Sequence, residues 1–413
     1  MQTDVQESPQ PGWDAVVAGH ICLDIIPDLS DAFPSRAGAS GAPSLASLLR
    51  PGKLVEVGDA VLSTGGAVSN TGLALHRLGI QTQLMGKVGA DPLGRVVRDI
   101  VSRWAAHLAD GMVEDPETGT SYTVIISPPG IDRVFLHSPG ANNTFGADDV
   151  RYDVVARSRL FHFGYPPLMQ RTYADHGREL TEIFRRVRQL NVTTSLDMAL
   201  PDPNSEAGRV DWAAILTDTL PYVGIFLPSI EEILYMLRPD SYDDLSRSGS
   251  GNLMDSVTPE LLTDVSEELL ALGVGIVGLK LGERGFYLRT ANATKLASLG
   301  KAAPADLSDW ADRELWAPCF RANLVGTTGA GDATIAGFLS ALLRGLPVMQ
   351  AVTMAVAVGA CNVEAADALS GLLGWEETVA RVAEGWEHHP MTLSDTAWVY
   401  LWDAGLWARE AGR

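Results

Sequence analysis

A run of small residues at 323–345, NLVGTTGAGDATIAGFLSALLRG, carries the strongest chemical signal in the chain. Apolar residues then recur at helical spacing, which predicts an amphipathic helix from about Asp332 to Gly345. Gly329 and Gly331 would lie at its N-terminus, where glycine lets the backbone approach a ligand and the free N–H groups of the first turn point outward. Such a turn binds anions, phosphates above all.

Asp332 places a carboxylate where this turn would attract phosphate. One interpretation is that Asp332 is the N-cap of the predicted helix, a role that aspartate commonly fills. The other is that Asp332 is a general base, close enough to the phosphate site to deprotonate a hydroxyl that then attacks the phosphate. A glycine-rich turn by itself is weak evidence and does not separate the two.

Two further segments carry groups that suit a polyhydroxylated ligand. In STGGAVSNTGLALHRLG, residues 63–79, Gly65 and Gly66 open a predicted helix and Asn70 lies one turn into it, with an amide that can donate and accept hydrogen bonds. In GHICLDII, residues 19–26, a predicted strand ends by presenting Asp24, a carboxylate that could hold two sugar hydroxyls. A buried helix with a satisfied Asn70 and a turn role for Asp24 are the structural alternatives.

The elements that must position these residues alternate between short β-rich runs and helical stretches from Val16 onward, a rhythm typical of a mostly parallel sheet covered on both faces. Thr290–Pro318 departs from it and is predicted to be a long excursion. The predicted strands are Val16–Ala18 with Ile21–Ile25, Thr82–Val88, Tyr122–Ile126, Arg133–His137, Leu160–Phe163, Thr193–Asp197, Ile225–Leu227, Ile276–Leu279 and Gly285–Leu288.

Two segments mix apolar and polar residues as half-exposed antiparallel strands do, and they predict a small β lid, near residues 53–63 and 119–137. Residues 1–15 are interpreted as an N-terminal tail. Residues 374–413 hold five tryptophans and are predicted to form a helical extension, on which Trp398 and Trp402 would share one face at i, i+4. This extension would either dock on its own domain or form a subunit interface in a homodimer.

Taken together, these segments resemble the ribokinase-like PfkB family of carbohydrate kinases over residues 16–373, and GTTGAGD followed by an apolar helix is close to the most specific signature of that family. Six weaker motifs follow the same order as in the family. They are KVGADPLGRVV at 87–97, SPGANNTF at 138–145, FHFGY at 161–165, SLDMALP at 195–201, FLPSIEEI at 226–233 and LKLGERG at 279–285.

The resemblance implies a doubly wound α/β fold with a β lid, and transfer of the ATP γ-phosphoryl group to a sugar-like hydroxyl. Asp332 would be the catalytic base. The Thr328–Gly331 turn, with Gly329, Ala330 and Gly331, would be the anion hole. The substrate would be held by Asp24, Gly65, Gly66 and Asn70. The nucleotide would be bordered by Thr328, Lys280, Gly282 and Gly285, and Glu232 would help to organise Mg²⁺ through water.

Three positions depart from the family pattern. Gly326 stands where the family commonly has an aspartate associated with a monovalent-cation site, so weak or absent potassium activation is expected. Ser229 replaces the usual asparagine of the Asn-x-x-Glu segment, so metal organisation would differ in detail. Lys280 replaces a threonine and would either contact nucleotide phosphates or lie on the surface.

The amino-acid composition of the 413-residue chain limits the classes of partner that it could bind. The 31 basic and 51 acidic side chains give a net charge of −20, which disfavours nucleic acid and anionic membranes as partners. Three cysteines and an N-terminus without signal-peptide character predict a cytoplasmic protein. The resulting hypothesis is an ATP- and Mg²⁺-dependent sugar kinase. A kinase for a nucleoside or a vitamin-precursor hydroxymethyl group, or an inactive binding protein of the same fold, are the alternatives.

Overall fold

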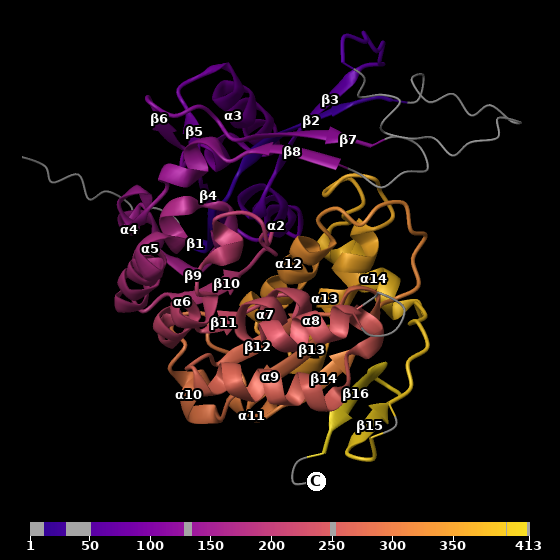
Figure 1. The fold of residues 1–413 in the computed structure, drawn as a ribbon. Helices are drawn as coiled ribbons and strands as arrows, with labels where there is room; N and C mark the ends of the chain where they lie inside the picture. The colour runs from indigo at the N-terminus through magenta and orange to yellow at the C-terminus, as the bar shows by residue number, and fades with distance from the viewer. Residues whose placement is uncertain (1–11, 30–50, 128–133, 248–252, 394, 411–413) are drawn as a thin grey trace, which may run out of the picture.

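The large central sheet matches the predicted α/β architecture. A computed structural model of the chain describes residues 12–29, 51–127, 134–247, 253–393 and 395–410. Its ten-stranded sheet is parallel from β4 to β12 and antiparallel beyond (Figure 1). In spatial order the strands are β15 (Trp398–Leu401), β16 (Leu406–Arg409), β14 (Glu314–Ala317), β13 (Phe286–Thr290), β12 (Ile276–Lys280), β11 (Ile225–Phe226), β10 (Thr193–Asp197), β9 (Ser158–Gly164), β1 (Trp13–Gly19) and β4 (Thr82–Met85).

Helices cover both faces of this sheet, and alternate residues of β1 face different cores: Val17 belongs to one buried cluster and Val16 to the other. The first face is covered by α2 (Ala67–Arg77), α10 (Ala293–Ala297), α11 (Leu307–Trp310), α12 (Ala330–Leu343), α13 (Val348–Asn362) and α14 (Trp375–Ala383). The second is covered by α4 (Tyr152–Val155), α5 (Gln170–Gln189), α6 (Trp212–Thr219), α7 (Ile230–Leu237), α8 (Pro239–Arg247) and α9 (Pro259–Ala271). Helix α3 (Pro92–Trp104) packs against the lid strands β2 (Cys22–Pro27) and β3 (Ala60–Gly65).

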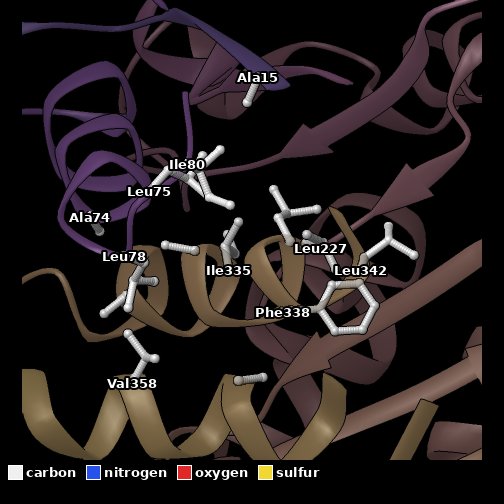
Figure 2. Packing of buried hydrophobic residues seen from close by; sticks show 14 of the residues in the cluster. Ala15, Ala74, Leu75, Leu78, Ile80, Leu227, Ile335, Phe338, Leu342 and Val358 are labelled. Carbon is white, nitrogen blue, oxygen red and sulfur yellow. The ribbon is translucent and has the colours of Figure 1, made fainter. Parts of the chain in front are cut away.

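Helix α12 is the central helix of the first face, packed between α2 and α13 (Figure 2). Its residues Ile335 and Phe338 are fully buried against this cluster. Gly337 allows close approach of α13, because a Cβ there would lie 2.5 Å from the Met354 carbonyl oxygen. A helix buried on nearly all sides is held rigidly, so its N-terminal turn is a firm platform for a functional site.

The predicted lid is a separate four-stranded sheet in the order β3 (Ala60–Gly65), β2 (Cys22–Pro27), β7 (Tyr122–Ile126) and β8 (Val134–Ser138), seen at the top of Figure 1. Lid positions 128–133 lie outside the described residues. The predicted strands Val16–Ala18 and Ile21–Ile25 both form, the first in the main sheet and the second in the lid. Gly19, with φ +124, turns the chain out of the main sheet, so Asp24 lies within a lid strand rather than at a strand end.

The predicted helical extension is wrong beyond α14. Trp398 and Trp402 do not share a helix face, because residues 398–409 form the hairpin β15–β16, which pairs with β14 and extends the main sheet. Trp398 is buried and Trp402 is 86 % exposed. The predicted excursion at Thr290–Pro318 contains β14, an interior strand, and the predicted N-terminal tail is too long by three residues because β1 begins at Trp13.

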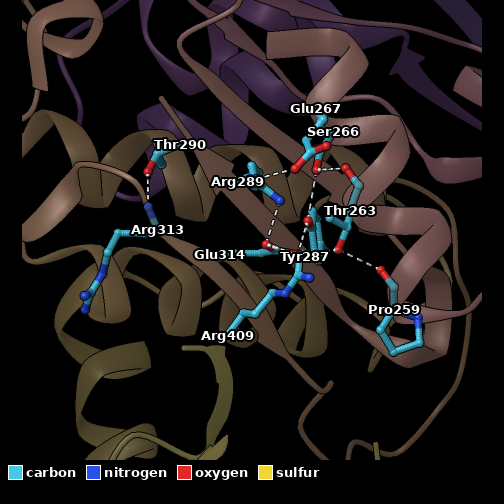
Figure 3. Close-up of polar contacts among 10 residues, drawn as sticks. All are labelled: Pro259, Thr263, Ser266, Glu267, Tyr287, Arg289, Thr290, Arg313, Glu314 and Arg409. Atoms are coloured by element: carbon cyan, nitrogen blue, oxygen red, sulfur yellow. Dashed lines mark hydrogen bonds and ion pairs between the residues drawn. The ribbon is translucent and has the colours of Figure 1, made fainter. Parts of the chain in front are cut away.

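A buried carboxylate ties the hairpin to the domain (Figure 3). Glu314 of β14 accepts hydrogen bonds from Thr263 of α9 at 2.6 Å and from Tyr287 of β13 at 2.8 Å. It also pairs with Arg289 at 2.6 Å and with Arg409 of β16 at 3.3 Å. Three neighbouring strands and one helix therefore share a single carboxylate.

Among the described residues, no helix combines the length and apolar character that crossing a membrane requires.

Candidate active site

Asp332 is buried, and it does not cap its helix. Helix α12 begins at Ala330, two residues earlier than predicted, and its N-cap is Gly329, in the left-handed region at φ 73 with no side-chain capping bond. Asp332 is therefore the third residue of the helix and is 3 % exposed. The N-cap interpretation of this carboxylate is wrong, and its burial needs another explanation.

Three side-chain donors surround the Asp332 carboxylate. Tyr165 donates to Oδ2 at 2.7 Å, Asn70 Nδ2 donates to the same oxygen at 3.2 Å, and Thr71 donates to Oδ1 at 2.8 Å. Asn70 and Thr71 come from the N-terminal part of α2, and Tyr165 follows the carboxyl end of β9 in a left-handed conformation, φ 65. A buried carboxylate is stable only when its oxygens are hydrogen-bonded, and these donors meet that need.

The predicted anion-binding turn lies beside a buried ammonium group. A Cβ on Gly329 would be 2.6 Å from the Cβ of Ala368, so the turn packs closely against the chain beyond α13. A Cβ on Gly331 would lie 3.4 Å from Cδ and 3.7 Å from Nζ of Lys280. The positive end of the α12 dipole and a lysine charge therefore meet at one place, which suits a phosphate.

Lys280 is not on the surface, so that alternative is wrong. Its Nζ lies 2.5 Å from Oδ1 of Asp197, and the two side chains are 13 % and 1 % exposed. The other oxygen of Asp197, Oδ2, is buried without a hydrogen-bond partner among the described residues. The sequence motif SLDMALP contains Asp197 but predicted no role for it, although a carboxylate that ends the buried strand β10 was a usable signal.

Charge is concentrated around this pair. Burial raises the pKa of Asp197 above its usual value, and Glu232 and Asp332 raise it further, whereas the Lys280 ammonium lowers it. Burial alone would lower the pKa of Lys280, but Asp197, Glu232 and Asp332 together hold it above its usual value. Three carboxyl groups thus face one ammonium, and a cation bound among them would favour their ionised forms.

Glu232 takes part in a capping box with Ser229, the residue that replaces the family asparagine. The Glu232 N–H donates to Ser229 Oγ at 3.2 Å, and Ser229 N–H donates to Glu232 Oε2 at 2.7 Å, at the start of α7. Ser229 is therefore used as a helix cap, and the box fixes the Glu232 carboxylate near Lys280 and Asp197. Among the described residues, no group of three or more potential ligands forms a metal cage.

The predicted substrate residues gather at the junction of the lid and α2. A Cβ on Gly65 would lie 2.3 Å from Asp24 Oδ2, so only glycine admits this carboxylate. Burial raises the pKa of Asp24 to about 6, and the Cys22 thiol donates to its Oδ1 at 3.4 Å. Gly66 is the N-cap of α2 with φ 87, and Asn70, bonded to Asp332, keeps its Oδ1 without a hydrogen-bond partner among the described residues. Substrate and base residues thus share one site.

The two predicted nucleotide glycines lie in the loop that follows Lys280. A Cβ on Gly282, where φ is 54, would meet no atom within 4 Å, whereas a Cβ on Gly285 would lie 2.0 Å from the Ala317 carbonyl oxygen. Gly285 is therefore required for packing, whereas the space beside Gly282 is open.

Two cavities in the described part of the chain, of about 810 and 730 Å³, lie at the C-terminal hairpin and beside β13, and neither is lined by a candidate site residue.

Comparisons with known proteins show the family to which this chain belongs. Residues 42–373 match the model of the pfkB family carbohydrate kinases. An uncharacterised sugar kinase of Archaeoglobus fulgidus is 26 % identical over 300 residues, 73 % of this chain and 98 % of the relative. A 2-dehydro-3-deoxygluconokinase of Bacillus subtilis is 24 % identical, covering 78 % of this chain and 87 % of the relative.

Solved structures support the same fold. A putative ribokinase II from E. coli, in complex with ATP and Mg²⁺, superposes with a TM-score of 0.62 at 18 % identity, covering 90 % of this chain and 99 % of that one. Because the family match spans most of the sequence and the fold is that of ribokinases, the chain belongs to the PfkB family of carbohydrate kinases.

Proposed function

We propose that this protein transfers the γ-phosphoryl group of ATP to a hydroxyl of a sugar or sugar-like substrate, with Asp332 as the general base. The observation that carries the proposal is the placement of a buried, non-capping carboxylate on the first turn of α12, beside the predicted anion hole. A base in that position can accept the proton of a hydroxyl as the hydroxyl oxygen attacks phosphorus.

The donors around Asp332 orient it for that proton transfer. Tyr165 and Asn70 fix Oδ2 and Thr71 fixes Oδ1, so the carboxylate has one defined orientation before substrate arrives. Burial raises the pKa of Tyr165 well above its ordinary value, which keeps its hydroxyl a neutral donor. Preorganisation of this kind lowers the reorganisation that the reaction requires.

The transferred phosphoryl group would be stabilised by the Thr328–Gly331 turn, using the backbone N–H groups of Gly329 and Gly331, and by the Lys280 ammonium beside it, while the Ala330 N–H holds the turn by donating to the Thr327 carbonyl oxygen at 3.3 Å. The loop containing Gly282 and Gly285 would border the rest of the nucleotide, with the open Gly282 leaving space for it. On the acceptor side, Asp24, Gly65, Gly66 and Asn70 would hold the sugar through directional hydrogen bonds.

The residues present fit a magnesium ion bound largely through water and substrate. Glu232 and the unpartnered Oδ2 of Asp197 offer carboxylate oxygens, the ligand type that Mg²⁺ prefers, and Mg²⁺ commonly uses one or two carboxylates plus phosphates. When bound there, Mg²⁺ neutralises phosphate charge and aligns the phosphoryl group. The protein residues themselves hold the carboxylates apart, through the Ser229 capping box and the Lys280 ion pair.

The experiment that tests this function is a coupled ADP-release assay of the purified full chain with ATP and Mg²⁺ against neutral sugars, sugar acids, nucleosides and hydroxymethyl heterocycles. Sugar-dependent ADP release above the no-acceptor rate is expected, with the phosphorylated product identified by mass spectrometry. Turnover with a nucleoside or a heterocycle alone would assign the alternative kinase activity. Binding of acceptors without any turnover would identify an inactive binding protein instead.

A further inference from the structure

His20 is a buried histidine with no hydrogen-bond partner among the described residues, and it lies where the substrate would bind. It follows the carboxyl end of β1 and is 2 % exposed. Neither ring nitrogen has a partner in the described part of the chain. A neutral imidazole carries one N–H donor and one acceptor, so both of its polar functions are left unsatisfied inside the protein. Buried polar groups in native proteins almost always have a hydrogen-bond partner, and a hydroxyl of a bound ligand would be such a partner for His20.

The position of the ring is fixed by neighbours from both sides of the proposed site. A Cβ on Gly66 would lie 2.4 Å from His20 Nδ1, so the ring lies against the turn that opens α2. Its centroid is 5.4 Å from that of His137 on lid strand β8 and 6.2 Å from that of Tyr165, which bonds the base. A row of rings therefore runs from the lid to Asp332.

The same turn brings His20 close to the acceptor-side residues. Gly65 contacts Asp24 and Gly66 contacts His20, so one dipeptide separates the carboxylate from the imidazole. His137 is linked back to this group, because its Nδ1 lies 3.0 Å from Oγ1 of Thr123, which donates to the Cys22 sulfur at 3.8 Å. Asn70 adds an amide oxygen without a partner among the described residues, one turn along α2.

We propose that His20 is a substrate-contacting, specificity-determining residue whose ring hydrogen-bonds a hydroxyl of an uncharged sugar held between Asp24 and Asn70. The inference rests on the proposed kinase function and extends it to the class of acceptor. The charges of this group support an uncharged acceptor. Burial lowers the pKa of His20 to about 3 and that of His137 below its usual value, so neither ring is cationic near neutral pH.

Of His20, His137, Asn70 and Asp24, only Asp24 carries a formal charge near neutral pH, and that charge is negative. A sugar acid would bring its carboxylate next to Asp24, which like-charge repulsion disfavours in a partly buried site. Hydroxyls, by contrast, can donate to Asp24 and Asn70 and can either donate to or accept from His20. This preference separates the chain from a relative such as the 2-dehydro-3-deoxygluconokinase, which its name assigns to an acidic sugar.

The first test compares acceptor classes with the wild-type chain, using D-ribose, D-fructose and 2-keto-3-deoxy-D-gluconate as probes. A higher kcat/KM for one of the neutral sugars supports the inference. A higher kcat/KM for the sugar acid overturns the inference while leaving the kinase function intact. No turnover with any sugar would remove the proposed function itself, and the inference with it.

The second test uses His20→Leu and the conservative His20→Gln. Loss of a substrate hydrogen bond in His20→Leu should lower kcat/KM for the sugar by roughly tenfold while KM for ATP stays unchanged, and Gln should restore most of the loss. His107→Leu is the matched control, because His107 also has an orphaned ring nitrogen but stacks on Trp13 at the opposite end of β1. Equal sugar kinetics in His20→Leu and His107→Leu would overturn the inference.

A third measurement keeps the inference falsifiable if His20→Leu does not fold. Monodeoxy analogues of the preferred sugar are assayed with the wild type and with His20→Gln. One deoxy position should lose roughly tenfold in kcat/KM with the wild type and distinctly less with the variant, because the deleted hydroxyl and the altered ring are partners. If every deoxy analogue loses the same factor in both proteins, His20 does not contact the sugar.

Discussion

The hydroxyl of Tyr165 donates a hydrogen bond to Oδ2 of Asp332 across 2.7 Å, joining the end of strand β9 to the first turn of α12. The two residues are 167 positions apart in the chain, and Tyr165 holds a left-handed conformation to make the contact. A non-glycine residue with positive φ is strained, and such strain persists where the surrounding structure fixes it, often at functional sites. This bond marks Asp332 as an oriented acceptor.

Replacing Asp332 by asparagine should therefore abolish most turnover without unfolding the protein. The amide cannot accept the hydroxyl proton, so we expect kcat to fall by roughly 10²–10⁴, or about 2.7–5.4 kcal/mol in barrier height. ATP affinity, measured by titration calorimetry, should hold or rise because one negative charge is lost. The control is Asp306→Asn, since Asp306 caps α11 and asparagine caps equally well. Near wild-type turnover in a folded Asp332→Asn protein would exclude the base role.

Lys280→Met should affect the nucleotide side of the reaction. Removing the ammonium beside Gly331 leaves the transferring phosphoryl group without one stabilising charge, so kcat/KM for ATP should fall by roughly 10²–10³. The matched variant is Lys301→Met, because Lys301 donates to the Ala156 carbonyl oxygen on the surface, away from the site. Steady-state kinetics with ATP varied measure both. An unchanged kcat/KM for ATP would mean that Lys280 serves only to neutralise Asp197.

Sugar binding should improve as the pH rises through about 6. Burial raises the pKa of Asp24 from 3.8 to about 6, so the side chain is mainly ionised only above that pH. The ionised carboxylate accepts hydrogen bonds from sugar hydroxyls more strongly than the neutral acid does. The same raised pKa means that the folded state holds a proton which the unfolded state releases, so the stability contribution of Asp24 falls as pH rises between these values.

The measurement is kcat/KM for the sugar from about pH 5 to about pH 8, with Asp24→Asn alongside the wild type. The variant should lose the rise near pH 6 and keep a low, flat sugar kcat/KM. A wild-type pH profile that persists unchanged in Asp24→Asn would assign the ionisation to another group.

Potassium should activate the enzyme weakly or not at all. Gly326 offers no carboxylate, and a Cβ there would lie 2.9 Å from the Ala365 carbonyl oxygen and 3.0 Å from Cα of Ala366. Because both contacts are backbone, the loop has no room for an aspartate in its present conformation. We expect kcat to change less than about twofold, or about 0.4 kcal/mol in barrier height, when K⁺ replaces a bulky organic cation at constant ionic strength. A large rise in kcat would contradict this.

Stability should depend strongly on Glu314. In Glu314→Ala, Arg289 and Arg409 lose a shared buried partner, so the free energy of unfolding should fall by about 3–5 kcal/mol. Arg409→Ala should cost less, about 1.5–3 kcal/mol, because Arg289 still pairs with Glu314. Urea unfolding followed by tryptophan fluorescence measures both, with Arg409→Lys as the charge-preserving control. Equal losses in the two alanine variants would show that the hairpin, rather than the carboxylate network, sets the stability.

Local features, which depend on neighbouring residues, could be predicted along the chain. The βαβ rhythm predicted a mostly parallel, two-sided sheet, and the periodicity after Gly331 placed the start of α12 within two residues. Asp332, Asn70 and the Gly65–Gly66 turn were also found from residue type and spacing, and the structure brings them together in one site. Amphipathic helices and glycine turns depend on residues a few positions apart, so they can be predicted from short stretches of sequence.

Features that depend on residues distant in the chain could not be predicted from the local pattern. The i, i+4 tryptophans predicted a helix, but pairing of β16 with β14, strands far apart in the sequence, made residues 398–409 a hairpin. Lys280 is buried because Asp197, 83 positions earlier, neutralises it at the carboxyl edge of the sheet. The burial of both His20 ring nitrogens without a partner among the described residues depends on lid strand β8 and on Tyr165, whose rings lie beside it. Burial and long-range pairing are properties of the packed chain, and no local pattern encodes them.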